Sequence, residues 1–240
     1  MKEQSLPHFS VIAFDADDTL WDCQGHFEYV CEQLYSLLAP WAPHDEAAQA
    51  LFATERKNMD QLGYGTKAFS LSVLETAMRV SNNELPTERL AWLQQQCYTL
   101  LHLPATPLPG VQETLSQLQK NGHQMVVFTK GELLDQENKL QRSGLSGFFS
   151  HVEITSNKSE KEFAQLCQKL NIAPEQLLMV GNSLRSDIAP ALAIGAWAVH
   201  IPYHITWELE HSEAFQHDRL LEIVHFNELI PILKNQQKQA

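Results

Sequence analysis

The chain has 240 residues, a length that allows one large domain or two small ones. Apolar residues make up 44% of it and charged residues 19%, proportions that are ordinary for a folded protein and exclude a disordered one. Acidic residues outnumber basic ones by 29 to 17, so the formal net charge is −12. Because such a surface repels nucleic-acid phosphates, nucleic acid is not an expected partner. An anionic substrate would need a positive side chain at its binding site.

Two features of the sequence favour a cytoplasmic protein without a membrane partner. No apolar run approaches the roughly 18–20 residues that a membrane-spanning helix needs, and the first residues lack the pattern of a secretory signal peptide. The four cysteines form no Cys-x-x-Cys pair, which argues against a zinc ribbon or a thioredoxin-type site. Isolated cysteines are typical of a reducing compartment.

Short apolar segments predict the strands of a parallel sheet. The first, Phe9–Phe14, stops abruptly at an acidic stretch. Similar segments follow at 124–129 and 177–182, and weaker ones occur at 151–155 and 197–201. Nearly continuous apolar strands are expected where helices cover both faces of a sheet.

Amphipathic stretches separate these strands from about residue 106 onward. Apolar residues share one helical face in 111–118 and again in 163–170. This alternation of strand and helix predicts a doubly wound, Rossmann-like α/β fold.

Residues 22–105 differ from the rest because they contain helical periodicity and no strand signal. Apolar residues recur at helical spacing in 27–38 and in 90–101. We therefore expect an all-helical domain at 22–105, inserted into an α/β core formed by 1–21 and 106–240.

Polar side chains follow several of the predicted strands. In open α/β sheets the ligand site lies beyond the carboxyl ends of the strands, so these side chains are expected to meet there. Crowded carboxylates repel one another unless a cation or shared protons intervene, and such oxygen ligands suit Mg²⁺ together with substrate phosphate oxygens. One carboxylate can also act as a nucleophile that forms an aspartyl-phosphate. The residues concerned are Asp15, Asp17, Thr129, Lys158, Asn182 and Asp187.

The order and spacing of these residues resemble the four motifs of the haloacid dehalogenase-like (HAD) hydrolase superfamily. Residues 15–19, Asp-Ala-Asp-Asp-Thr, resemble the first motif, and 126–129, an apolar strand ending in Thr, resemble the second. Lys158 resembles the third-motif lysine, and 180–187 resemble the fourth motif. The similarity covers nearly the whole chain, and the helical insertion lies where that family places its cap domain.

The resemblance implies a role for each first-motif residue. Asp15 would be the nucleophile that accepts the phosphoryl group. Asp17 would protonate the leaving oxygen and then activate water, since a group that has given its proton is a base for the next step. Thr19 would contribute to substrate binding.

The later motifs imply the remaining contacts. Thr129 and Lys158 would bind the non-transferred phosphate oxygens, with Lys158 also offsetting the charge of the nucleophile, and Lys130 is a further substrate contact. In phosphoryl transfer most of the catalytic effect comes from positioning and charge neutralisation. The Mg²⁺ ligands would be the Asp15 carboxylate, the Asp17 main-chain carbonyl, and Asn182 or Asp187.

Two positions depart from the family pattern. Asn182 stands where the family usually has Asp or Glu, so the site loses one negative charge and Asp187 becomes the more important carboxylate. Lys158 is followed by Ser159, where the family often has Pro, which leaves Lys161 and Lys130 as rivals for the third-motif role.

The function predicted from these residues is a Mg²⁺-dependent phosphatase acting on a small phosphorylated metabolite. Asp17 favours this over a dehalogenase, because an alkoxide leaving group needs a proton and a halide does not; such help is typically worth ~10²–10⁴ in rate. A phosphomutase using the same residues stays open, as does a non-catalytic phosphate sensor suggested by Asn182. A receiver domain is excluded by the chain length and the helical insertion. The sequence leaves the oligomeric state open.

Overall fold

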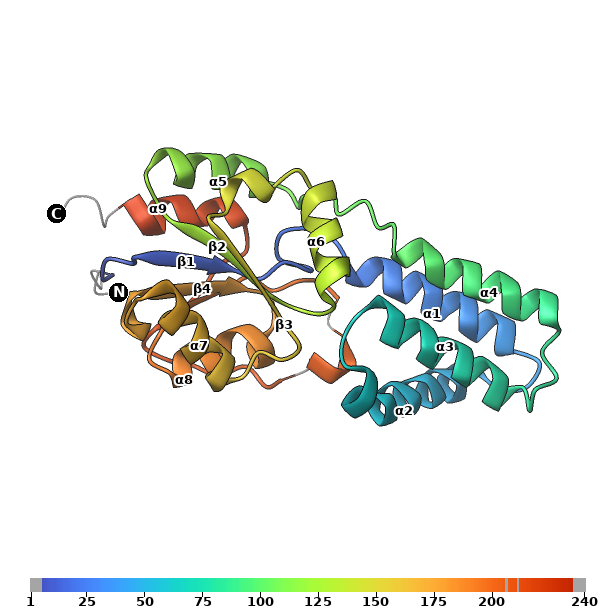
Figure 1. Cartoon of the computed structure of the whole chain (residues 1–240). Coiled ribbons are helices and arrows are strands. Elements are labelled where there is room, and N and C mark those ends of the chain that lie inside the picture. The colour runs from blue at the N-terminus through green and yellow to red at the C-terminus, as the bar shows by residue number, and fades with distance from the viewer. Residues whose placement is uncertain (1–5, 206, 211, 235–240) are drawn as a thin grey trace.

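The computed structural model describes residues 6–205, 207–210 and 212–234. An α/β unit and a bundle of helices lie end to end along the long axis of the molecule, and α6 (Leu133–Arg142) lies at their junction (Figure 1). No helix in the described ranges combines the length and the apolar character needed to cross a bilayer.

The sheet of the α/β unit has six parallel strands in the order β3-β2-β1-β4-β5-β6. The chain runs outward from β1 through β2 to β3 and then crosses back to β4 on the other side of β1. The strand order therefore reverses beside β1, and ligands bind at this position in doubly wound sheets. The strands are β1 (Val11–Phe14), β2 (Met125–Lys130), β3 (His151–Thr155), β4 (Leu177–Gly181), β5 (Trp197–His200) and β6 (Leu220–Glu222).

Helices cover both faces of this sheet. Figure 1 shows α5 (Val111–Lys120) and α9 (Leu229–Lys234) on one face, and α7 (Glu160–Leu170) and α8 (Ala189–Ala193) on the other. Because side chains alternate along a strand, β1, β2 and β4 each contribute to two hydrophobic clusters, one on each face of the sheet. All four residues of β1 are buried.

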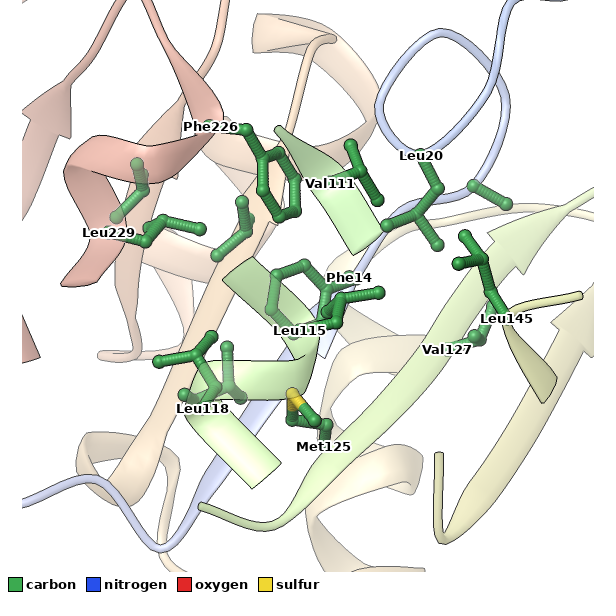
Figure 2. Close-up of a cluster of buried hydrophobic side chains, with 14 of the residues drawn as sticks. Phe14, Leu20, Val111, Leu115, Leu118, Met125, Val127, Leu145, Phe226 and Leu229 are labelled. Carbon is green, nitrogen blue, oxygen red and sulfur yellow. The ribbon is translucent and has the colours of Figure 1, made fainter. Parts of the chain in front are cut away.

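One of the two clusters surrounds Phe14 (Figure 2). The rings of Phe14 and Phe226 stack with centroids 5.7 Å apart, and Leu115 of α5 and Met125 of β2 belong to the same cluster. Val11 and Ala13, the alternate residues of β1, belong to the cluster on the opposite face. Burial on both faces explains why the central strands are continuous apolar runs.

The predicted doubly wound α/β fold is confirmed, and each of the five predicted strands is present. The sequence did not predict β6, which has only three residues and pairs at the edge of the sheet with β5. Its residues are half-buried or exposed, so it lacks the apolar signal that marks the inner strands.

The helical segment forms a bundle with a hydrophobic core of its own. Residues 22–105, all of which the structure describes, contain no strand. Their buried residues, among them Leu34, Leu51, Val73 and Leu93, form a cluster separate from those of the sheet. The four helices are α1 (Gln24–Leu38), α2 (His44–Leu62), α3 (Thr66–Val80) and α4 (Thr87–Leu100).

Gly181, the last residue of β4, allows a close approach of the fourth-motif carboxylate. A Cβ atom at this position would lie 2.4 Å from Oδ2 of Asp187 and 2.6 Å from its Cβ. We expect Gly181→Ala to lower the free energy of unfolding by roughly 1–3 kcal/mol, because the added methyl group overpacks this contact. Urea denaturation measures the change.

Gly147→Ala is the matched control, because a Cβ there has no neighbour within 4 Å. It should leave the free energy of unfolding unchanged or raise it by up to about 1 kcal/mol. Equal effects of the two substitutions would contradict the close packing of Gly181 against Asp187.

Candidate active site

A cavity of about 860 Å³ lies between the carboxyl edge of the sheet and the helical bundle. Its wall includes residues that follow β1, β2 and β4, together with residues of α1, α2 and α3. A ligand pocket at the carboxyl edge of a doubly wound sheet is the position that the strand order favours.

The strand ends bring four of the predicted site residues to this cavity. Asp15 follows β1, Thr129 is the penultimate residue of β2, and Asn182 follows β4. Lys158 comes from the segment between β3 and α7 and also lines the cavity. They meet because β2, β1 and β4 are neighbours and run parallel, so their carboxyl ends share one edge.

Lys158 joins two carboxylates that would otherwise repel each other. Its ammonium donates hydrogen bonds to Asp15 and, at 2.6 Å, to Oδ1 of Asp187, and its side chain is only 1% exposed. Burial and the neighbouring Asp187 carboxylate raise the pKa of Asp15 to about 7, against the lowering effect of Lys158. Lys158 itself has a raised pKa, because the attraction of the two carboxylates exceeds the effect of burial. One ammonium therefore compensates two buried carboxylates incompletely.

The local sequence explains the position of Lys158. Ser159 is the N-cap of α7, and its side chain and that of Glu162 form a capping box. This fixes the start of the helix, so the preceding lysine is directed to the end of the sheet. Lys161, its rival in the sequence, lies within α7 and is exposed.

Asp187 reaches the site from a turn of π-helix at Leu184–Ile188. The main-chain N–H of Ser183 donates to its Oδ2 at 2.9 Å, which leaves Oδ1 for Lys158. Short π-helical turns are rare, and many of those that occur lie at functional sites.

Asp17 lies two residues after the nucleophile position and is held by three donors. Lys139 of α6 approaches both of its carboxylate oxygens, at 2.9 and 2.8 Å. Gln136 and the indole of Trp21 each donate a hydrogen bond of 2.8 Å. Burial alone would raise the pKa of Asp17, but the Lys139 ammonium and the two further donors hold it below its usual range. Asp17 is therefore ionised in this arrangement.

Lys139 also connects Asp17 to the helical bundle. Its Nζ lies 3.5 Å from Oδ2 of Asp135, one turn earlier on α6. Thr66, the first residue of α3, donates a 2.9 Å hydrogen bond to the same Asp135 oxygen. A chain of polar contacts thus runs from the bundle to the carboxylate of Asp17.

Lys130 is occupied by partners other than a phosphate site. Its ammonium pairs with Glu210, donates to Ser186 at 3.0 Å and lies 3.7 Å from the centroid of the Tyr64 ring. Ser183 also donates to Glu210, at 2.6 Å. Lys130, which the sequence predicts as a substrate contact, lines the cavity, but its charge is neutralised by Glu210.

Thr19, which the sequence predicts as a substrate contact, lies between two other predicted site residues. It is not among the described residues that line the cavity. Its hydroxyl lies 3.2 Å from Oδ2 of Asp15 and 3.1 Å from Oδ1 of Asn182, so it can donate to one of them at a time. Thr19 thus holds together two of the predicted metal ligands.

The donor set fits a hard divalent cation. Asp15 and Asp187 provide two carboxylates for the single ammonium of Lys158, and Asn182 provides an amide oxygen. Magnesium prefers oxygen ligands and uses few carboxylates.

Lys139 and Gln136 are site residues that the sequence did not reveal. In α6 the polar residues Asp135, Gln136 and Lys139 are buried, whereas Leu133 and Leu134 are 62% and 60% exposed. The leucines at the start of this helix predict that their side of it is buried, whereas the structure buries the side that carries Gln136 and Lys139. The i, i+3 spacing of Gln136 and Lys139 was the only signal, and it is common on solvated helices.

Comparison with known proteins agrees with this geometry. The sequence profile of the haloacid dehalogenase-like hydrolases matches residues 9–195. A solved haloacid dehalogenase-like family hydrolase from Xanthomonas campestris is 28% identical, with a TM-score of 0.83 over 100% of this chain and 97% of that one. The chain therefore belongs to the haloacid dehalogenase-like hydrolase family.

Two named phosphatases are among the curated relatives. A glyceraldehyde 3-phosphate phosphatase of Pyrococcus furiosus is 33% identical over 44% of this chain and 47% of its own length, so the match spans about half of that relative. A phosphoglycolate phosphatase of Vibrio vulnificus is 27% identical over 80% of this chain and 83% of its own length.

The buried pair of Lys139 and Asp17 makes a prediction about stability. We expect Lys139→Met to lower the free energy of unfolding by roughly 3–5 kcal/mol, because it leaves the buried Asp135 and the partly buried Asp17 without their cation. Urea denaturation at pH 7 measures the loss.

Lys169→Met removes the same charge from a surface pair and serves as the control. Lys169 is 55% exposed in its pair with Glu153, so its loss should cost about 0–1 kcal/mol. If the two variants are equally stable, Lys139 does not compensate the carboxylates as described.

Proposed function

We propose that this protein is a Mg²⁺-dependent phosphatase that hydrolyses a small phosphorylated metabolite. The observation that carries the proposal is the pairing of Lys158 with both Asp15 and Asp187 at the carboxyl edge of the sheet, with a further aspartate, Asp17, on the same cavity. The phosphatases among its relatives support the same reaction class.

In the first step an oxygen of Asp15 attacks phosphorus, and the bond between phosphorus and the ester oxygen breaks. Asp15 becomes an aspartyl-phosphate. Lys158 offsets the negative charge that accumulates beside the nucleophile, and the hydroxyl of Thr129 donates to a phosphate oxygen. Positioning and charge compensation are the main contributions of a protein to phosphoryl transfer.

Asp17 moves the protons in both steps. It must carry a proton to give one to the leaving alkoxide, whereas Lys139 favours its ionised form. A substrate phosphate near Asp17 adds negative charge and favours protonation, which opposes the effect of Lys139. In the second step ionised Asp17 takes a proton from water, and the water oxygen attacks phosphorus. The bond between phosphorus and the Asp15 oxygen breaks, which regenerates the Asp15 carboxylate and releases inorganic phosphate.

The metal would be held by the Asp15 carboxylate, the main-chain carbonyl of Asp17, Asn182 and Asp187. When bound, Mg²⁺ neutralises charge on the phosphate and on the nucleophile. The four cysteines are free and buried. Because a reducing compartment keeps thiols unpaired, we propose that the enzyme is cytoplasmic.

We propose that residues 22–105 act as a cap over the core formed by 1–21 and 106–240. The cap contributes the wall of the cavity opposite Asp15, from α1, α2 and α3. Closure over the site would exclude water and order the substrate. The presence of a second carboxyl group, Asp17, on the cavity favours phosphate esters over halides, because only the ester oxygen needs a proton.

Turnover of p-nitrophenyl phosphate tests the proposed reaction. We expect Mg²⁺ to support release of phosphate, EDTA to abolish it, and Asp15→Asn to lower kcat by at least about 10³-fold because the nucleophile is lost. Phosphate release is measured at pH 7 with excess Mg²⁺. Retention of most of the turnover by Asp15→Asn would rule out the aspartyl-phosphate scheme.

Asn182 makes a separate prediction about the metal. Asn182→Asp adds a carboxylate to the ligand set, so the Kd for Mg²⁺ should fall by roughly tenfold. The shift of Tm with added Mg²⁺ measures binding without reference to activity. Asn138→Asp, an exposed change of the same charge on α6, should leave the Kd unaltered. Equal Kd values for Asn182→Asp and the unmodified protein would remove Asn182 from the proposed metal site.

A further inference from the structure

The charges that line the cavity are strongly unbalanced. Among the described residues, the lining holds nine carboxylates and three lysines, and no arginine or histidine. A cavity that takes an anionic phosphate group would ordinarily be expected to offer spare positive charge. The lysines are Lys130, Lys139 and Lys158.

Each of the three ammonium groups already has a carboxylate partner. Lys158 pairs with Asp15 and Asp187, and Lys139 pairs with Asp17. Lys130 pairs with Glu210, whose pKa is held below its usual range by Lys130 and two serine hydroxyls despite burial. The lysine nearest the nucleophile is needed for the transferred phosphate, so the described lining has no further cation for a second anionic group.

The cap side of the cavity carries carboxylates without ion-pair partners. Glu55 of α2 accepts a hydrogen bond from Trp207, and its close neighbours Glu28 and Glu208 are also acidic. Glu28 accepts a 2.8 Å hydrogen bond from the amide of Gln24. No ion pair to Glu28, Glu55 or Glu208 occurs among the described residues. Burial, with these negative neighbours, raises the pKa of Glu55 to about 7.

Aromatic rings line the same part of the cavity. The rings of Phe27 and Phe69 meet edge to face with centroids 4.9 Å apart, and those of Tyr64 and Trp207 with centroids 5.8 Å apart. Carboxylates together with aromatic faces form an environment that stabilises an organic cation. The same environment disfavours an anion, because its charge would be desolvated beside like charges.

We infer that the natural substrate is a phosphate monoester whose alcohol part carries a protonated amine, bound beside Glu55, and no second anionic group. This inference rests on the proposed phosphatase activity and names the substrate class of the same cavity. An ammonium group at Glu55 would supply the cation that the cap side lacks. The substrate named for the Vibrio relative, phosphoglycolate, carries a carboxylate, and this cavity is expected to reject it.

Three phenyl phosphates that differ only in their para substituent test the inference. The substituents are aminomethyl, hydroxymethyl and carboxymethyl, which are cationic, neutral and anionic at pH 7. The phenolic leaving groups are similar, so differences in kcat/KM report on binding of the substituent. We expect the aminomethyl ester to exceed the carboxymethyl ester by roughly tenfold or more, with the hydroxymethyl ester between them.

Substitution of Glu55 tests its part in this preference. Glu55→Gln should reduce the ratio of kcat/KM between the aminomethyl and carboxymethyl esters, and Glu55→Lys should invert it. Glu46→Gln makes the same change on an exposed part of α2 outside the cavity lining and should leave the ratio unaltered.

The outcomes separate this inference from the proposed activity. If p-nitrophenyl phosphate is hydrolysed but the carboxymethyl ester is preferred, or if Glu55→Gln leaves the ratio unchanged, the inference is overturned and the phosphatase stands. If no ester, including p-nitrophenyl phosphate, is hydrolysed with Mg²⁺, the proposed activity fails and the substrate class fails with it.

Discussion

The buried ammonium of Lys158 between Asp15 and Asp187 is the interaction on which the site depends. Burial and repulsion from the Asp187 carboxylate raise the pKa of Asp15, and the ammonium of Lys158 opposes both effects. The two carboxylates share this one ammonium, and in the proposed function a divalent metal ion would offset the remaining negative charge. The same need for compensation recurs at Asp17, where Lys139 provides the cation, and at Glu210, where Lys130 does.

The sheet makes this concentration of charge possible. Parallel strands direct their carboxyl ends to one edge, and the strand order places β2, β1 and β4 side by side. The helices that flank the sheet bury both of its faces, so its hydrophobic stabilisation comes from residues away from the polar edge. This edge can therefore carry charged groups, because the hydrophobic core of the unit lies elsewhere.

The sequence predicted what depends on neighbours along the chain. Continuous apolar runs revealed β1 and β4 because both faces of these strands are buried. The polar residues that end these strands were predicted as site residues because the carboxyl ends of parallel strands share one edge of the sheet. Pairings across long separations could not be predicted. Lys130 and Glu210 are 80 residues apart, and Lys139 lies on a helix in which Leu133 and Leu134 are exposed. Thr19 was predicted as a substrate-binding residue, and its hydroxyl lies near the side chains of Asp15 and Asn182.

The contact between Thr66 and Asp135 joins the helical bundle to the sheet unit at a sensitive point. Asp135 and Asp17 share one ammonium, that of Lys139. Any displacement of α3 from α6 would remove the hydroxyl donor from Asp135 and strengthen its competition for that ammonium. Asp17 would then lose part of its cation. The proton affinity of Asp17 thus depends on the position of the bundle. In the proposed mechanism, the shape of the molecule and the protonation state of its acid/base group would belong to one equilibrium.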